Sequence, residues 1–153
     1  MKKVLLFAIV LVFALQMNVL GQTQMSGRNF GLGLEFGDYP GVIGKVWVTD
    51  INAFSAGVGF GSFTRVHLDY LWHDFSVFKM NEGRLPLYYG FGGIINTYKD
   101  MSASFGARGT LGICYIFKEN YFDIFLELSP TIRFGTDSGL YFSGAVGVRY
   151  FFY

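Results

Sequence analysis

Apolar and polar residues alternate along most of the chain, and the pattern is clearest at its carboxyl end. One face of the last segment carries Leu140, Phe142, Val146, Val148, Tyr150 and Phe152, and the other carries Ser143, Ala145, Gly147 and Arg149. Alternation with a period of two predicts a β-strand with one apolar face. A terminal strand that is apolar on one face and ends in aromatic residues is typical of the last strand of a bacterial outer-membrane β-barrel.

The same alternation recurs in earlier segments, which are separated by short clusters of Gly, Asp, Asn and Pro. The expected strands cover residues 29–36, 42–48, 53–61, 64 to about 73, 85–95, 105–117, 121–134 and 140–152. Short separations favour hairpins between consecutive strands. The sequence therefore predicts about eight antiparallel strands, the smallest usual size of an outer-membrane barrel.

The charged residues decide which face of each strand points outward. When every apolar stripe is turned outward, the charges within the strands fall on the opposite face, which a barrel turns to its lumen. Aromatic residues also gather at strand ends, where a membrane barrel carries its interfacial girdles. The pattern predicts an all-β fold, an eight-stranded antiparallel up-and-down transmembrane β-barrel. A secreted barrel of the lipocalin type is the alternative, since its strands alternate equally well.

The amino-terminal segment is typical of an export signal. Lys2 and Lys3 form a basic head, residues 4–15 are apolar, and small or moderate residues precede Gln22. The apolar run is shorter than the roughly 20 residues that a membrane helix needs, although an uncleaved anchor is an alternative. We expect a cleavable signal peptide over residues 1–21, a barrel over residues 22–153 and a location in the outer membrane of a Gram-negative bacterium.

Composition narrows the function. Removal of Lys2 and Lys3 with the signal leaves ten basic residues against 11 acidic ones, and this balance argues against a nucleic-acid partner. The chain has 21 Gly, 18 Phe and 10 Tyr but only 15% charged residues, which is unusual for a soluble domain. Its single cysteine, Cys114, cannot form an internal disulfide, and we expect it to be buried.

The inward charges are the candidate site. An eight-stranded barrel is filled by its own side chains, and buried charges must be paired. The expected structural network comprises Glu35, Lys45, His67, Asp69, Arg108, Asp123, Glu127 and Arg149. Closing the first turn around Pro40 places Glu35 opposite Lys45. Closing the last turn around Asp137 places Phe125 opposite Arg149, with Asp123 and Glu127 on the diagonals.

Two other functions compete with a structural or surface-interaction role. His67 and Asp69 share a strand face, and Ser55 on the next strand would complete an acyl-transfer triad, as in a lipid A-modifying enzyme. A narrow pore or small-ligand carrier is the second alternative. Because the three residues face the filled lumen rather than lipid, we expect no enzyme, no catalytic residue and no cofactor. His73 is expected to be solvated at its strand end, and no spacing is typical of a metal site.

The loops offer little surface to a partner. With both termini in the periplasm, the extracellular loops are residues 37–41, 61–64, 96–104 and 135–139, and 96–104 is the longest uninterrupted one. The segment 74–84 is then periplasmic, where turns are normally tight. Its apolar residues, Phe75, Val77, Phe78 and Met80, are expected to tuck into the barrel mouth, with contact to a periplasmic partner as the alternative.

Five stretches carry a family resemblance: KVW (45–47), DYLWHDF (69–75), GRLPLYYGFGG (83–93), DIFLELSP (123–130) and GVRYFF (147–152). Together they resemble a family of small predicted outer-membrane β-barrels of unknown function. The resemblance implies a build similar to outer-membrane protein X and the membrane part of outer-membrane protein A.

The carboxyl terminus also predicts how the barrel is inserted. We expect a monomer placed in outer-membrane lipid by the barrel-assembly machinery, which reads the last strand through Tyr150, Phe152 and Tyr153. That signal usually stops on an aromatic residue at the place of Phe152, so Tyr153 extends it by one residue.

Overall fold

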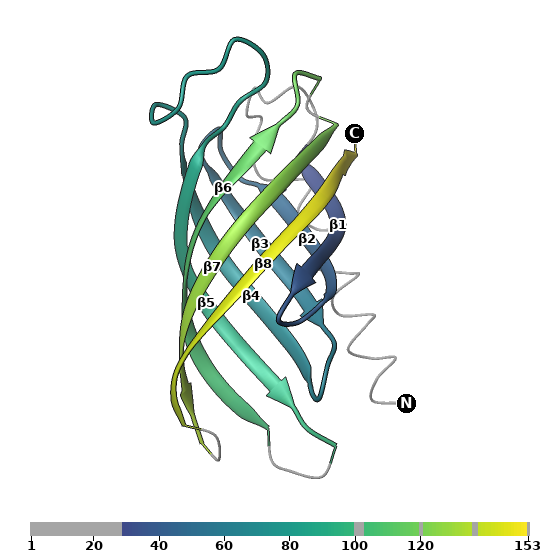
Figure 1. Cartoon of the computed structure of the whole chain (residues 1–153), viewed down its shortest axis with the longest axis vertical. Helices are drawn as coiled ribbons and strands as arrows, with labels where there is room; N and C mark the ends of the chain where they lie inside the picture. The colour runs from purple at the N-terminus through teal and green to yellow at the C-terminus, as the bar shows by residue number, and fades with distance from the viewer. Residues whose placement is uncertain (1–28, 100–102, 120, 136–137, 153) are drawn as a thin grey trace.

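The computed structural model describes residues 29–99, 103–119, 121–135 and 138–152. Eight antiparallel strands form a closed barrel in which each strand pairs with its neighbours in the chain and β8 pairs back with β1 (Figure 1). The strands are β1 Phe30–Gly37, β2 Gly41–Trp47, β3 Asn52–Gly59, β4 Thr64–Asp74, β5 Leu87–Thr97, β6 Ser104–Ile116, β7 Phe122–Phe134 and β8 Gly139–Phe152.

This architecture confirms the predicted eight-stranded up-and-down barrel. The expected signal peptide, residues 1–21, and Tyr153 lie outside the described residues. Within the part of the chain that the structure describes, no helix is long and apolar enough to cross a membrane.

Side chains alternate between the outside of the barrel and its lumen, as the pleat of a strand requires. In β7 the outward residues Phe122, Ile124, Leu126 and Leu128 are between 46% and 61% exposed, whereas every inward residue between them is buried. Apolar inward residues gather near the end where β8 finishes. This core comprises Ile43, Trp47, Ala53, Leu71, Tyr88, Cys114, Ile116, Phe125 and Phe151, and it includes the cysteine that was expected to be buried.

The hairpin registers differ from those predicted. Glu35 lies opposite Gly41, and Lys45 lies opposite Gly31, so the predicted Glu35–Lys45 pair is wrong. Arg149 lies directly opposite Asp123 instead of Phe125. Both differences shift the register by an even number of residues. Such a shift leaves every side chain on its own face of the sheet, so the alternation of the sequence cannot exclude it.

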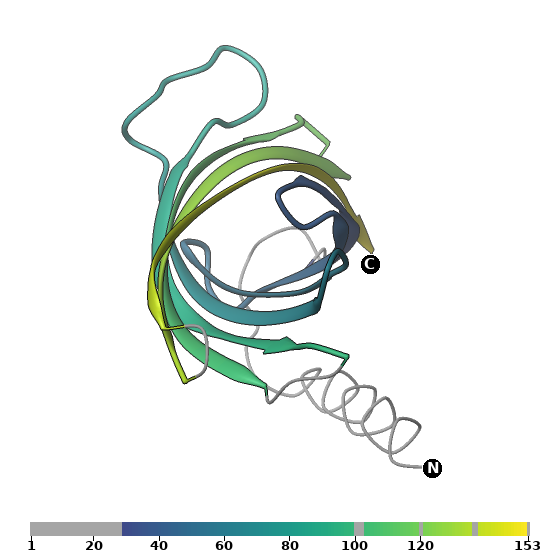
Figure 2. The same ribbon diagram turned by 60° about the horizontal axis from the view of Figure 1, so that its bottom comes forward.

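The longest connection between strands whose bounds the structure gives is the β4–β5 loop, residues 75–86, rather than the predicted 96–104. Phe75 is half-buried against the core, as expected. Val77, Phe78 and Met80 were also expected to pack into the barrel mouth. This expectation is wrong, because their side chains are 47%, 44% and 48% exposed. Both views show this loop extending beyond the strands at the end where β8 finishes (Figures 1 and 2).

Outward aromatic residues lie near the same end, in or next to β1, β4, β5, β6 and β8. Their ring centroids lie close together within and between strands, at 4.7 Å for Tyr70–Trp72, 6.1 Å for Trp72–Tyr89 and 6.1 Å for Phe30–Phe152. We call this set the aromatic band; it comprises Phe30, Tyr70, Trp72, Tyr89, Tyr115, Phe117, Tyr150 and Phe152.

Candidate functional site: the charged lumen

The structure places all the residues of the expected network inside the barrel. None is more than 6% exposed: Glu35, Lys45, His67, Asp69, Arg108, Asp123, Glu127 and Arg149. They do not form one continuous network. They separate along the barrel axis into a cluster around Asp123, a cluster around Arg108 and a cavity beyond it.

The Asp123 cluster lies near the end where β8 finishes. The Arg149 guanidinium donates to both carboxylate oxygens of Asp123, from Nε to Oδ1 at 2.8 Å and from Nη2 to Oδ2 at 2.9 Å. Lys45 Nζ lies 3.8 Å from Asp123 Oδ2. This two-point pairing is the strongest geometry available to an arginine and a carboxylate. It follows from the register, which sets the two residues directly opposite each other on β7 and β8.

His73 completes this cluster, so the expectation that it is solvated is wrong. Its Nδ1 lies 3.1 Å from the Ile51 carbonyl oxygen and its Nε2 lies 2.8 Å from Lys45 Nζ. The carbonyl and the ammonium together assign a neutral ring that donates through Nδ1 and accepts through Nε2. The Trp47 ring, 4.3 Å away, and the Phe75 ring, 6.4 Å away, cover the imidazole. The β4–β5 loop therefore helps to bury His73, which the sequence pattern predicted to be exposed to solvent at the end of its strand.

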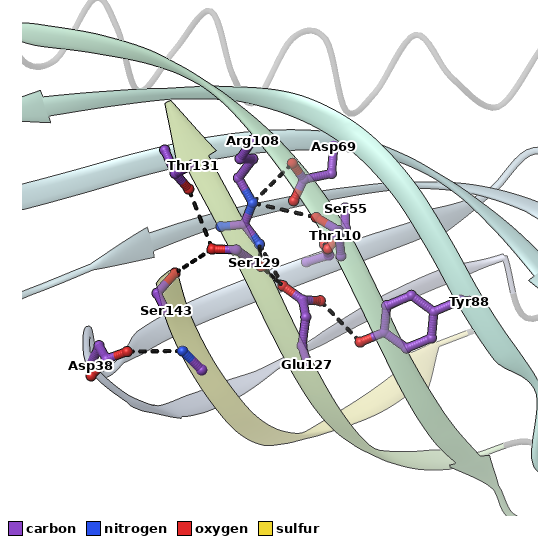
Figure 3. Close-up of polar contacts among 12 residues, drawn as sticks. Asp38, Ser55, Asp69, Tyr88, Arg108, Thr110, Glu127, Ser129, Thr131 and Ser143 are labelled. Carbon is purple, nitrogen blue, oxygen red and sulfur yellow. Dashed lines mark hydrogen bonds and ion pairs between the residues drawn. The ribbon is translucent and has the colours of Figure 1, made fainter. Parts of the chain in front are cut away.

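The Arg108 cluster occupies the middle of the lumen (Figure 3). Arg108 forms ion pairs with Asp69, at 3.2 Å, and with Glu127, and its Nη2 donates to the Ser129 hydroxyl at 2.8 Å. The Tyr88 hydroxyl donates to the other oxygen of Glu127 at 2.9 Å. Sequence reasoning missed Tyr88, although the alternation of β5 places it inward between Leu87 and Tyr89.

A small cavity lies next to the Arg108 cluster. Its lining includes Glu35, Tyr39, Arg65, His67, Arg108, Glu127, Ser129 and Ser143. The space open to the centre of a water molecule is about 20 Å³, which is room for about one water. His67 Nε2 has no hydrogen-bond partner among the described residues. A Cβ placed on Gly57 would lie 2.8 Å from this nitrogen and 3.2 Å from Glu35 Oε1, so the two side chains converge above that glycine.

Two arginines stack on aromatic rings near the β1–β2 turn, and one of them, Arg65, also lines the cavity. The Arg65 guanidinium lies 3.6 Å from the centre of the Tyr39 ring, and its Nε donates to Asn96 Oδ1 at 3.1 Å. Arg133 lies 3.8 Å from the Tyr141 ring and donates to the Tyr39 hydroxyl at 3.3 Å. The prediction omitted both arginines from the network. Strand alternation was sufficient to find Arg133, because it shares the inward face of β7 with Asp123 and Glu127.

A solved structure shares this fold. The chain resembles the N-terminal β-barrel domain of OprF from Pseudomonas aeruginosa. The TM-score is 0.55 at 21% sequence identity, and the match covers 82% of this chain and 98% of that domain. No protein-family model and no curated protein sequence matches the chain. The comparison therefore shows that the two chains share a barrel fold, and the family of small barrels indicated by the sequence motifs stays a prediction.

The residues considered for an acyl-transfer triad do not form one. The Ser55 hydroxyl donates to the Gly44 carbonyl oxygen at 3.4 Å, and the described residues offer His67 Nε2 no hydroxyl. A nucleophile needs a hydrogen bond to its base, which this arrangement lacks. The described residues also contain no group of three or more metal-ligating side chains placed to hold an ion.

Proposed function

We propose that the chain is a small outer-membrane β-barrel with a closed lumen and a structural or surface-interaction role. One observation carries the proposal: large apolar side chains cover the outside of all the strands, while the charged side chains of the strands, apart from Asp74 at the end of β4, are buried inside. A soluble barrel would have the opposite arrangement, with its apolar residues inside. In lipid the outward apolar surface is solvated, and closure of the sheet satisfies every backbone group.

The distribution of charge along the lumen supports a closed barrel rather than a pore. At the end where β8 finishes, Lys45 and Arg149 exceed Asp123 by one positive charge. In the middle, Arg108 faces Asp69 and Glu127, with Glu35 beside the cavity. The two arginines near the β1–β2 turn add positive charge again. Because the sign of the net charge alternates along the axis, an ion of either sign meets a layer of like charge that repels it. The cavity has room for about one water, which is too little to hydrate an ion.

The terminal strand supports insertion by the barrel-assembly machinery. Tyr150 and Phe152 point outward within the aromatic band and are 38% and 44% exposed. The Phe152 ring lies 6.1 Å from the Phe30 ring on β1, so the last strand closes the barrel beside the first. We propose a monomer in which these outward aromatic side chains are the part of the assembly signal that the machinery contacts.

The first test concerns the location of the chain in the outer membrane and the closure of its barrel. Outer membranes that contain the chain are run on a gel with and without heating; a closed membrane barrel migrates differently before heating, and heat-independent migration would contradict the proposal. Spin labels at Leu126 and Glu127 then test orientation, and contact with acyl chains is expected only at Leu126. An opposite result, or a processed chain that is freely soluble without detergent, would rule out the membrane barrel.

Two further measurements separate the alternatives. In planar bilayers we expect no single-channel conductance, because charged side chains fill the lumen; a steady conductance would favour the pore. Deletion of the gene should leave the masses of lipid A species unchanged, and a defined mass shift restored by the intact gene would favour the enzyme.

A further inference from the structure

We propose that the tip of the β4–β5 loop, residues 77–81, inserts into the lipid interface beside the barrel, at the end where β8 finishes. This inference rests on the proposed membrane location and extends it. It assigns a lipid-binding role to a loop that a minimal barrel does not need, since the turns on the periplasmic side of such barrels are normally short.

Both arms of the loop are fixed to the barrel. At its start, Asp74 Oδ1 accepts hydrogen bonds from the Ser76 amide at 2.8 Å and the Ser76 hydroxyl at 2.6 Å, which turns the chain out of β4. Phe75 packs against the buried core. At its end, Arg84 and Ile116 exchange two backbone hydrogen bonds of 2.8 Å and 2.7 Å. The tip is therefore held in position by a defined base.

The returning arm continues the line of β5 along β6, because the Pro86 and Arg84 carbonyl oxygens accept backbone hydrogen bonds from Cys114 and Ile116. The hydroxyl of Tyr115, an outward residue of the aromatic band, donates to the Glu82 carbonyl oxygen at 3.2 Å. Gly83 has a φ of 68°, and a Cβ at this position would lie 2.7 Å from the Tyr115 hydroxyl oxygen. Only glycine combines this conformation with so close an approach to the ring. An outward side chain of the wall therefore contacts the base of the loop, and both views show the loop extending beyond the strands (Figures 1 and 2).

The chemistry of the tip fits a lipid surface. Its three apolar side chains, Val77, Phe78 and Met80, are exposed and lie around Lys79. Apolar residues that flank a lysine partition into the boundary between headgroups and acyl chains, where the ammonium meets phosphate and the apolar groups leave water. Continuity with the aromatic band favours lipid over a protein partner, because Tyr115 marks the interfacial level from which the tip extends.

The experiment places an environment-sensitive fluorophore on single introduced cysteines, Phe78→Cys and Met80→Cys. The full mature chain is folded into phosphatidylcholine and phosphatidylglycerol vesicles that contain lipids brominated in the upper acyl chain. Labelling after folding modifies only the new cysteine, because Cys114 is buried. Lys118→Cys, exposed in the β6–β7 turn at the same end, is the matched control. We expect quenching at positions 78 and 80 to be several-fold stronger than at position 118.

A fourth variant, Leu126→Cys on the outward face of β7, separates the two proposals. Strong quenching at position 126 with no more quenching at 78 and 80 than at 118 would overturn the loop proposal and leave the membrane barrel intact. Absence of quenching at position 126 as well would overturn the membrane barrel itself. A blue-shifted, unquenched probe at 78 or 80 would mean that the tip packs on protein, which also overturns the lipid contact.

Discussion

Two histidines of β4 show how differently the two ends of the lumen are built. His73 and His67 lie on the same inward face, and they are 4% and 3% exposed. His73 has a partner at each ring nitrogen, within a cluster covered by Trp47 and Phe75. His67 faces a cavity, and its Nε2 has no partner among the described residues. Burial alone therefore does not make the lumen a uniform filling: His73 has partners at both ring nitrogens at one end, whereas His67 lies beside a cavity with room for water.

Arg149→Leu should have the largest effect. It removes both hydrogen bonds to Asp123 and leaves a fully buried carboxylate with only Lys45, at 3.8 Å, to balance it. Breaking a buried pair by removing one partner costs about 3–5 kcal/mol, and we expect the free energy of unfolding to fall by that amount. Urea unfolding in lipid vesicles measures it. The double variant Asp123→Leu/Arg149→Leu should lose less, because no carboxylate is stranded; an unchanged single variant would contradict the role given to the pair.

The Arg149 pair also shows what the sequence can and cannot predict. Alternation correctly placed Arg149, Asp123 and Glu127 inside the barrel, because a period of two defines the face of every residue. It could not choose between Asp123 and Phe125 as the residue opposite Arg149, because a shift of two residues preserves the faces. That choice depends on the conformation of the turn, and the sequence pattern carries little information about it.

The histidines show a second limit of the same kind. The sequence placed His73 correctly at a strand end but predicted that it would be solvated. Its burial depends on Trp47 from β2, which is distant in the sequence, and on Phe75, which lies in the β4–β5 loop beyond the end of the alternating pattern. Periodicity describes the wall of a barrel well, and it says little about what covers the ends.

His73→Leu should have an intermediate effect. The substitution leaves the fully buried Lys45 ammonium without its 2.8 Å acceptor. Loss of a partner from a buried charged group costs about 2–3 kcal/mol, and the free energy of unfolding in urea should fall accordingly. The conservative variant His73→Gln, whose amide oxygen can accept from Lys45, should recover part of the loss. Equal losses for the two variants would mean that the imidazole acts only through packing.

His67→Leu should have a small effect of the opposite sign. It removes a buried nitrogen that has no partner, and replacement of an unsatisfied polar group by an apolar one of similar size is neutral or stabilising. We expect a change within about 1 kcal/mol, towards higher stability, in the same urea assay. A loss as large as that of His73→Leu would show that His67 holds an ordered partner, and the contrast between the two ends would then fail.

The accessibility of cysteine thiols to a water-soluble reagent tests the comparison between the two ends of the lumen. It needs only a substitution that we expect to change stability very little. Cys114 lies in the core near the Asp123 cluster and is 1% exposed, whereas Ser143 lines the cavity. The variant Ser143→Cys keeps the size of the side chain and places a thiol at a partly exposed position on the cavity wall. A water-soluble thiosulfonate should modify it in folded barrels in vesicles, and Cys114 in the unchanged chain should react only after denaturation. Mass spectrometry counts the modified thiols. If Cys114 reacts as fast as the introduced cysteine, the end where β8 finishes is as open to water as the cavity, and the lumen has no sealed end.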